Sequence, residues 1–419
     1  MPNLRGDWRN KVQHKCVTTF EPKWQDCMAN SYYTINRILL LCVGLWPYQN
    51  SSFRHIVIAF TTVILMSSVV FQLTTFITTE YSSNLLLQVL AYSIPWLAYT
   101  LKYNVLCLNI KKMRGLMKQV RRDWNALSSA QEIEIIKKYW AFGRFITLIT
   151  TLFIYLSIFG FILVQFLSNF LLDIATTANL SRSRRLPIKV EYFMDQQKYF
   201  TPLLLHIFLI VLCGLTTVAA TETLSMLYMQ HACGLFQIAN YRIERALHKN
   251  TIQNVTSSAE RSLIVCEKII SAVNMYRRAT KFVEMLSASF QWAYSLLLPL
   301  GVLSLSINLY RLSQLIMTEE YYELIVSILF IIGHFWYMFF CNYIGQEVID
   351  HSGHIFYRTY NTKWYVAPLK AQKLLLLVMQ RGMQHSSFVI GGMFIPSFKG
   401  FATLTSTSIS YFTVIFSIH

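Results

Sequence analysis

Residues 201–229, TPLLLHIFLIVLCGLTTVAATETLSMLYM, contain a single charged side chain, Glu222, in an otherwise largely apolar stretch. A bilayer core takes about 20 such residues as one helix, so this stretch predicts a membrane span. The whole chain agrees with that prediction. Of its 419 residues 54% are hydrophobic and only 14% are charged, whereas a soluble domain carries about 25% charged residues. The composition therefore favours a polytopic membrane protein over a soluble enzyme.

The same criterion of length and apolarity identifies seven spans along the chain. They cover residues 54–77, 83–108, 140–171, 201–229, 282–310, 321–343 and 397–418. Two further apolar segments, 33–47 and 367–383, are too short or too charged to cross a membrane. They predict helices that lie at the inner interface or pack under the bundle. The predicted fold class is all-α, with seven transmembrane helices and short interfacial helices.

Lysine and arginine are unevenly distributed between alternate connecting segments. Segments 1–53, 109–139, 230–281 and 344–396 together hold 27 of them, whereas 78–82, 172–200 and 311–320 hold 6. Basic residues stay on the cytoplasmic side, which predicts a cytoplasmic N-terminus and an extracellular C-terminus. This orientation is the reverse of that of a G-protein-coupled receptor. In the longest outer segment, Asn179 of the sequon Asn179-Leu180-Ser181 is a candidate glycosylation site.

The net charge of +17 does not indicate nucleic-acid binding, because the cations lie in the gaps between apolar runs. No catalytic or phosphate-binding motif is present, so neither enzyme activity nor a cofactor is expected. His351 and His354 lack further ligands nearby, and no metal site is expected. A transporter would need carboxylates near the midplane. Ionisable residues within the spans are few: Lys102, Arg144, His206, Glu222, Glu284 and His334. The four that carry a charge, Lys102, Arg144, Glu222 and Glu284, lie toward the inner halves.

Four features in order along the chain resemble the insect odorant receptor family. The first is the inverted seven-span layout, and the second is Gly44-Leu45-Trp46-Pro47 before the first span. The third is the cytoplasmic run Gly345-x6-Ser352-x7-Tyr360-x3-Trp364, followed by the basic segment 367–383. The fourth is Tyr411-Phe412-Thr413-Val414 in the last span. Together these features cover nearly the whole chain.

The resemblance implies an odorant- or pheromone-gated, non-selective cation channel, assembled as a tetramer with the family's shared co-receptor. The family's co-receptor has a long inner loop, whereas segment 230–281 is short, so this chain resembles a ligand-tuning subunit. The expected location is the plasma membrane of an olfactory neuron dendrite. Four divisions of the chain are expected. Residues 1–53 form a cytoplasmic N-terminus with an interfacial helix, and residues 54–343 form a six-helix ligand-binding bundle. Residues 344–396 form a cytoplasmic anchor segment, and residues 397–419 form a pore-lining helix.

The last span carries a stripe of hydroxyl groups on one helical face. Thr403, Thr407, Ser410, Val414 and Ser417 recur at spacings of 4, 3, 4 and 3. Such a stripe suits a helix wetted on one side, but small residues also allow close helix packing. The resemblance favours pore lining. Val414, the one apolar member, matches the family's gate position and could close a pore by dewetting, whereas Ser417 matches a pore-mouth position.

The family's odorant pocket implies a site among the second, third, fourth and sixth spans, toward their outer halves. In this sequence, those parts of the spans contain Tyr92, Trp96, Tyr155, Phe159, Ile162, Phe166, His206, Ile210, Tyr322 and Ile325. Apart from Glu323, no acidic residue, lysine or arginine is predicted in these outer halves. A neutral hydrophobic volatile or a hydrocarbon is therefore the expected ligand, with membrane lipid as surroundings.

Two other interpretations remain open from the sequence. One is a metabotropic seven-helix chemoreceptor, which would require the opposite orientation or an inner docking site. The other is an auxiliary membrane subunit that has no ligand of its own. In the channel interpretation, a ligand bound among the outer halves of the spans favours a state in which the last helices move apart. The sequence supplies a candidate pocket and a candidate gate but no path between them.

Overall fold

The computed structural model describes residues 32–49, 52–127, 129–176, 186–247, 258–318 and 321–418. Within these ranges the chain is nearly all helical, and its one antiparallel bridge joins Ile390 to Phe394. The helices are α3 (Thr34–Cys42), α4 (Ser52–Leu73), α5 (Thr75–Thr78), α6 (Ser83–Leu108), α7 (Ile110–Asn125), α8 (Ala130–Thr176), α9 (Phe200–Ala246), α11 (Ser258–Thr318), α12 (Tyr321–Tyr360), η1 (Trp364–Val366), α13 (Leu369–Gly382) and α14 (Phe398–Ile418).

All seven predicted spans are confirmed as helices: α4 with α5, α6, α8, α9, α11, α12 and α14. Six of them are long and apolar enough to cross a membrane by length and composition alone. The seventh, α6, is less apolar because it carries polar side chains such as Gln88 and Lys102. It packs against α4, α9 and α11, where its polar side chains face protein.

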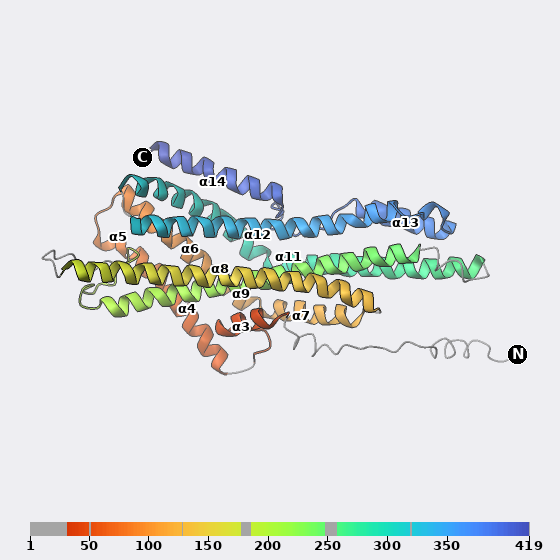
Figure 1. The fold of residues 1–419 in the computed structure, drawn as a ribbon, viewed down its shortest axis with the longest axis horizontal. Coiled ribbons are helices and arrows are strands. Elements are labelled where there is room, and N and C mark those ends of the chain that lie inside the picture. The colour runs from red at the N-terminus through yellow and green to blue at the C-terminus, as the bar shows by residue number, and fades with distance from the viewer. Residues whose placement is uncertain are drawn as a thin grey trace.

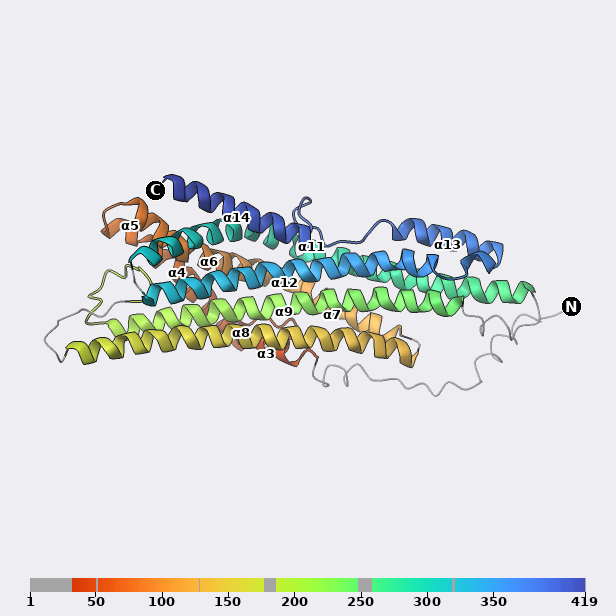
Figure 2. The ribbon, with the colours of Figure 1, turned by 45° about the horizontal axis from the view of Figure 1, so that its top comes forward.

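Several helices continue well beyond the predicted spans at one end of the molecule. The extensions of α9, α11 and α12 pack with α13 into a second bundle, at the end opposite α5 (Figure 1). Figure 2 shows the same arrangement from a direction turned by 45°. In this part of α11, the buried residues recur at spacings of 4, 3, 4 and 3: Val265, Ile269, Ala272, Tyr276 and Ala279. The predicted division at residue 343 falls inside α12, which continues unbroken to Tyr360.

The short predicted segments also form helices. α3 lies within 33–47 and α13 within 367–383. A third short helix, α7, was not predicted, because its six cations obscure its apolar face. That face is buried and is formed by Met113, Leu116, Met117, Val120 and Trp124.

Three residues of the quoted motifs have clear structural reasons. Gly44 has φ of +73°, in the left-handed region, and ends α3 so that Leu45 and Trp46 enter the core. Gly345 lies on α12 where a Cβ would overlap the carbonyl of Pro396, so the segment before α14 approaches α12 closely. Ser352 Oγ accepts the backbone N–H of Ser386 at 2.9 Å, which ties the chain after α13 to α12.

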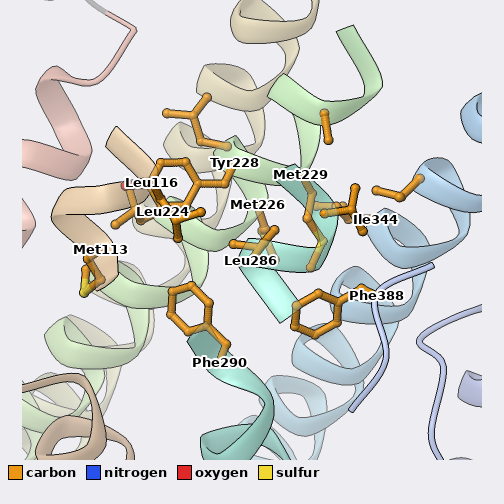
Figure 3. Close-up of a cluster of buried hydrophobic side chains, with 14 of the residues drawn as sticks. Met113, Leu116, Leu224, Met226, Tyr228, Met229, Leu286, Phe290, Ile344 and Phe388 are labelled. Carbon is orange, nitrogen blue, oxygen red and sulfur yellow. The ribbon is translucent and has the colours of Figure 1, made fainter. Parts of the chain in front are cut away.

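The core is built around α9. Every residue from 219 to 236 is buried, so this helix is covered on all sides. Figure 3 shows its side chains Leu224, Met226, Tyr228 and Met229 among residues of α7, α11 and α12. The central position of α9 explains why 201–229 is the most apolar of the candidate spans.

Candidate ligand cavity and pore helix

A cavity of about 220 Å³ lies between α6, α8, α9, α11 and α12. Its wall is mainly apolar and is rich in aromatic rings. The aromatic residues that line it are Tyr92, Trp96, Tyr99, Phe153, Phe161, Phe330, Trp336, Tyr337 and Phe340. A concave and largely apolar site of this kind suits a small organic molecule held by shape.

Pro95 lines this cavity within α6 and removes one N–H from the helix hydrogen bonds. In an unbroken helix that N–H would donate to the carbonyl of Ala91, four residues earlier. Asn308 of α11 donates its Nδ2–H to this carbonyl at 3.2 Å instead. The interruption in α6 is therefore bonded to α11, which fixes these two cavity walls to each other.

An ion pair lies at the end of the cavity nearer the second bundle. Lys102 of α6 donates to Glu222 of α9, and both side chains are buried at the cavity wall. Glu222 also accepts hydrogen bonds from Tyr294 of α11 at 2.9 Å and Tyr337 of α12 at 3.0 Å, with the Cys341 thiol at 3.7 Å. One carboxylate thus joins four helices. The sequence singled out both ionisable residues but not their position beside the ligand cavity.

A second charged pair lies toward the other end of the cavity. The Arg311 guanidinium carbon is 4.5 Å from the centre of the Tyr92 ring, and Arg311 Nη2 is 2.6 Å from Glu323 Oε2. Tyr92 lines the cavity, whereas Arg311 lies against the Tyr92 ring and does not line it. Charged groups therefore stand at both ends of the cavity, each with a partner of opposite charge.

A smaller cavity of about 50 Å³ adjoins the first and shares Met226 and Tyr337 with it. Its far wall is formed by Phe394, Pro396 and Leu404, at the base of α14. Tyr337 therefore stands between the larger cavity and the start of the last helix.

Helix α14 packs on α11 and α12 by one narrow face. Gly400 and Ser408 are its only buried residues among those described, with Leu404 and Ile415 half-buried on the same side. A helix turns about 100° per residue, which places Ser410 about 160° and Ser417 about 180° from Ser408.

The predicted hydroxyl stripe therefore faces away from the subunit. Thr403, Ser410, Val414 and Ser417 are exposed, and Thr407 is half-buried. Val414 is 52% exposed. This placement excludes packing within the chain as the reason for the stripe, and leaves packing against another chain, lipid or a water-filled path.

The predicted ligand residues fall into different surroundings. Tyr92 and Trp96 line the cavity. Ile210 is buried outside it, the Tyr155 hydroxyl lies 3.1 Å from Thr216 Oγ1, and His206 hydrogen-bonds to Ser67 and Tyr192. The remaining described members, exposed on the outer surface of the bundle, are Phe159, Ile162, Phe166 and Ile325. The side chain of Tyr322 and the whole of Asn179 lie outside the described residues.

The opposite face of α8 lines the cavity, through Thr150, Phe153, Ile154, Ser157, Ile158 and Phe161. Both faces of this helix are apolar. The inward face packs against protein, whereas on the outward face the Phe159 side chain is 62% exposed and that of Phe166 is 69% exposed. Helical periodicity alone does not separate two apolar faces. The distinguishing signal is the pair of hydroxyl residues, Thr150 and Ser157, on the inward face.

His351, considered above as a metal ligand, has partners within the protein. Its Nε2 lies 2.7 Å from the Tyr139 hydroxyl, and its Nδ1 lies 2.7 Å from the Glu347 carbonyl oxygen. Across the described ranges, no group of three or more potential ligands from His, Cys, Asp and Glu is assembled.

A family model described as "7tm Odorant receptor" matches residues 82–409, well over half of the chain. The chain belongs to the odorant receptor family. The match includes the second to sixth membrane spans of the receptor, which are α6, α8, α9, α11 and α12, and most of α14. No curated protein sequence matches the receptor.

Two solved structures of the insect olfactory receptor OR5 from Machilis hrabei are similar to the receptor in fold. The OR5 structure in complex with eugenol has a TM-score of 0.71 at 13% identity, over 93% of this chain and 98% of that chain. A second OR5 structure has a TM-score of 0.67 at 14% identity, over 94% and 99% of the two chains. The arrangement of helices is thus that of an insect olfactory receptor along almost its whole length.

Proposed function

We propose that the receptor is the ligand-tuning subunit of an odorant-gated, non-selective cation channel. In this assembly, four α14 helices surround one pore. The observation that carries the proposal is the uncovered hydroxyl face of α14, which lies opposite the face that packs on α11 and α12. An exposed row of hydroxyl groups on a membrane-spanning helix is stabilised by contact with water in a pore.

The hydrogen bonds of α14 fit this role. Thr403, Thr407, Ser410 and Ser417 donate their hydroxyl hydrogens to backbone carbonyls of the preceding turn, at 2.8 to 2.9 Å. Their oxygen lone pairs therefore remain available to water or a hydrated cation. No acidic residue occurs in residues 398–418, so sharp selectivity for divalent cations is not expected.

The cavity is the proposed odorant site. The related OR5 has been solved with eugenol, a small organic molecule, and the cavity here is enclosed by aromatic and aliphatic side chains. A ligand that presses on Tyr337 acts on the wall shared with the smaller cavity, and so on Phe394 and Pro396 at the base of α14. The ligand opens the pore only to the extent that it binds the open state more tightly than the closed state.

The proposed assembly is a heterotetramer with the family's co-receptor in the plasma membrane. The proposed orientation places the N-terminus and the second bundle in the cytoplasm. Exposed cations on α7 support this orientation, because basic residues gather on the cytoplasmic side: Lys111, Lys112, Lys118, Arg121 and Arg122.

The test is whole-cell recording from cells that express the receptor with and without the co-receptor, during a screen of neutral volatiles. The proposal predicts a ligand-evoked cation current that persists when G-protein signalling is blocked. A ligand response that disappears under the block would support a metabotropic receptor instead. If the receptor reaches the cell surface but the ligand tuning is the same as that of the co-receptor alone, the result would support an auxiliary subunit.

Filling the cavity is expected to shift ligand tuning toward smaller molecules. Gly301 and Gly333 both line the cavity, and a Cβ added at either position meets no atom within 4 Å. Gly301→Leu or Gly333→Leu would therefore place side-chain volume where the ligand binds. We expect at least about a tenfold loss of apparent affinity for the largest ligands, since two displaced methylenes contribute about 1.6 kcal/mol.

The matched control is Gly160→Leu on α8, where an added Cβ also meets nothing within 4 Å but the position does not line the cavity. Dose–response curves for a ligand series of increasing length measure the effect. Equal losses in the cavity variants and the control would contradict the assignment of the site.

A further inference from the structure

Several hydrogen-bond donors at the ligand cavity lack acceptors. Among the described residues, no acceptor is found for the indole N–H of Trp96, the indole N–H of Trp336 or the hydroxyl of Thr150. All three residues line the cavity, and these three atoms are shielded from solvent. A buried donor without an acceptor costs about 1 to 3 kcal/mol, so an acceptor brought in by a ligand would be favoured.

The Thr150 hydroxyl differs from its neighbour one turn earlier on α8. The Thr147 hydroxyl donates to the Gly143 carbonyl at 2.9 Å, the usual arrangement for a threonine inside a helix. Thr150 is also buried but makes no such bond. A ligand that turns this hydroxyl toward the cavity would therefore break no bond inside the protein.

Lys102 adds further donors at one end of the cavity. Its ammonium group has three N–H bonds, of which one points to Glu222, while the rings of Tyr294 and Tyr337 lie 5.7 Å away. Glu222, the strongest acceptor in the wall, already receives hydrogen bonds from Lys102 and both tyrosines. The indole and hydroxyl donors of the cavity are thus free, whereas its one carboxylate acceptor is already occupied.

The acceptor nitrogen of His334 is similarly engaged. His334 Nε2 lies 2.9 Å from the Ser304 hydroxyl, and its Nδ1 lies 2.8 Å from the Phe330 carbonyl oxygen. With Nδ1 protonated toward that carbonyl, Nε2 accepts from Ser304. A ligand that brings only donors is therefore left with neutral hydroxyl oxygens as acceptors in this wall, such as those of Thr150 and Ser157.

We propose that the cavity selects odorants that carry a hydrogen-bond acceptor oxygen, such as aldehydes, ketones and esters, over hydrocarbons of the same length and over amines. This inference rests on the proposed function and narrows its ligand class. Thr150 is a specificity-determining residue whose hydroxyl donates to the ligand oxygen. The aromatic wall holds the apolar body of the ligand, and a protonated amine is disfavoured because it brings a charge and only donors into a largely apolar cavity.

The experiment measures equilibrium binding to the full-length receptor, assembled with its co-receptor in lipid nanodiscs. The probes are the straight-chain aldehydes from butanal to dodecanal, the alkanes of equal length and the corresponding amines. At the chain length that binds best, the aldehyde is expected to bind at least about fivefold more tightly than its alkane, the effect of one neutral hydrogen bond. Thr150→Val keeps the shape and removes the hydroxyl, and is expected to weaken aldehyde binding about fivefold while leaving alkane binding unchanged.

Thr151→Val is the matched control, because the Thr151 hydroxyl is also buried without a partner but does not line the cavity. Equal affinity for aldehyde and alkane would overturn the inference and leave the odorant site standing. A Thr150→Val loss that is the same for both ligand classes would also overturn it. If no probe binds and no volatile evokes current, both the inference and the proposed function fail.

Discussion

Val414→Ser is expected to raise the current that flows in the absence of ligand by about tenfold. Val414 is the one apolar side chain in the hydroxyl stripe of α14, and it faces away from the rest of the subunit. Around a pore, copies of this side chain would form a constriction that excludes water. Each methylene-sized group removed from such a contact weakens it by about 0.8 kcal/mol. Removing two such groups shifts the equilibrium between the closed and open states about tenfold toward the open state.

The matched control for this prediction is Ile409→Ser. Ile409 is also an exposed aliphatic residue of α14, but it lies about 140° around the helix from Val414. Whole-cell current without ligand, normalised to surface expression, measures both variants. A rise in Val414→Ser alone supports the gate, whereas an equal rise in both variants, or none in Val414→Ser, contradicts it.

Lys102→Met is expected to destabilise the receptor by about 3 to 5 kcal/mol. This change leaves the Glu222 carboxylate buried at the centre of four helices without a cation, and an uncompensated buried charge is among the most costly defects in a protein. Glu222→Gln leaves the Lys102 ammonium equally unpaired. The double variant with both changes removes both charges, and its Gln retains oxygen and nitrogen atoms that can bond to Tyr294 and Tyr337.

The double variant is therefore expected to recover most of the stability that either single variant loses. The unfolding midpoint of the purified receptor in detergent measures all three variants. Arg358→Met is the control, since Arg358 pairs with Glu244, at 2.9 Å, on the exposed surface. Exposed pairs contribute about 0 to 1 kcal/mol, so little change is expected there. Additive losses in the double variant would contradict a coupled pair.

The membrane-spanning helices could be predicted from the sequence because apolar length is a direct physical requirement of the bilayer. The same criterion underestimated the length of the helices that form the second bundle. Residues 230–246 and 258–281 contain polar and charged side chains, so hydropathy marks them as connections, although α9 and α11 continue through them. Their helical signal is the spacing of Val265, Ile269 and Ala272, which depends on periodicity rather than on mean hydropathy.

The candidate site could be predicted only in part. Tyr92 and Trp96 were predicted from the position of the family's odorant pocket, and both line the cavity. On α8 the prediction assigned the ligand site to the outward aromatic stripe and not to the inward face that lines the cavity. The two faces are hard to separate because, in a membrane protein, apolar side chains cover both.

The pairing of Lys102 with Glu222 joins residues 120 positions apart. No local pattern encodes such a contact, although the cost of an unpaired charge in a span indicates that each needs a partner. The hydroxyl stripe of α14 was the clearest local signal, since hydroxyl spacing and exposure coincide there.

The most direct test of the account is the accessibility of cysteines introduced into α14. Ser410→Cys lies on the stripe and Ile409→Cys on a neighbouring exposed face, so both thiols can be treated with a charged, membrane-impermeant thiol reagent during ligand-evoked current. The account predicts that the reagent reduces current through Ser410→Cys receptors and leaves Ile409→Cys and unmodified receptors unchanged. Current that is unaffected in Ser410→Cys receptors, while Ile409→Cys receptors are blocked, would contradict a pore lined by the hydroxyl face of α14.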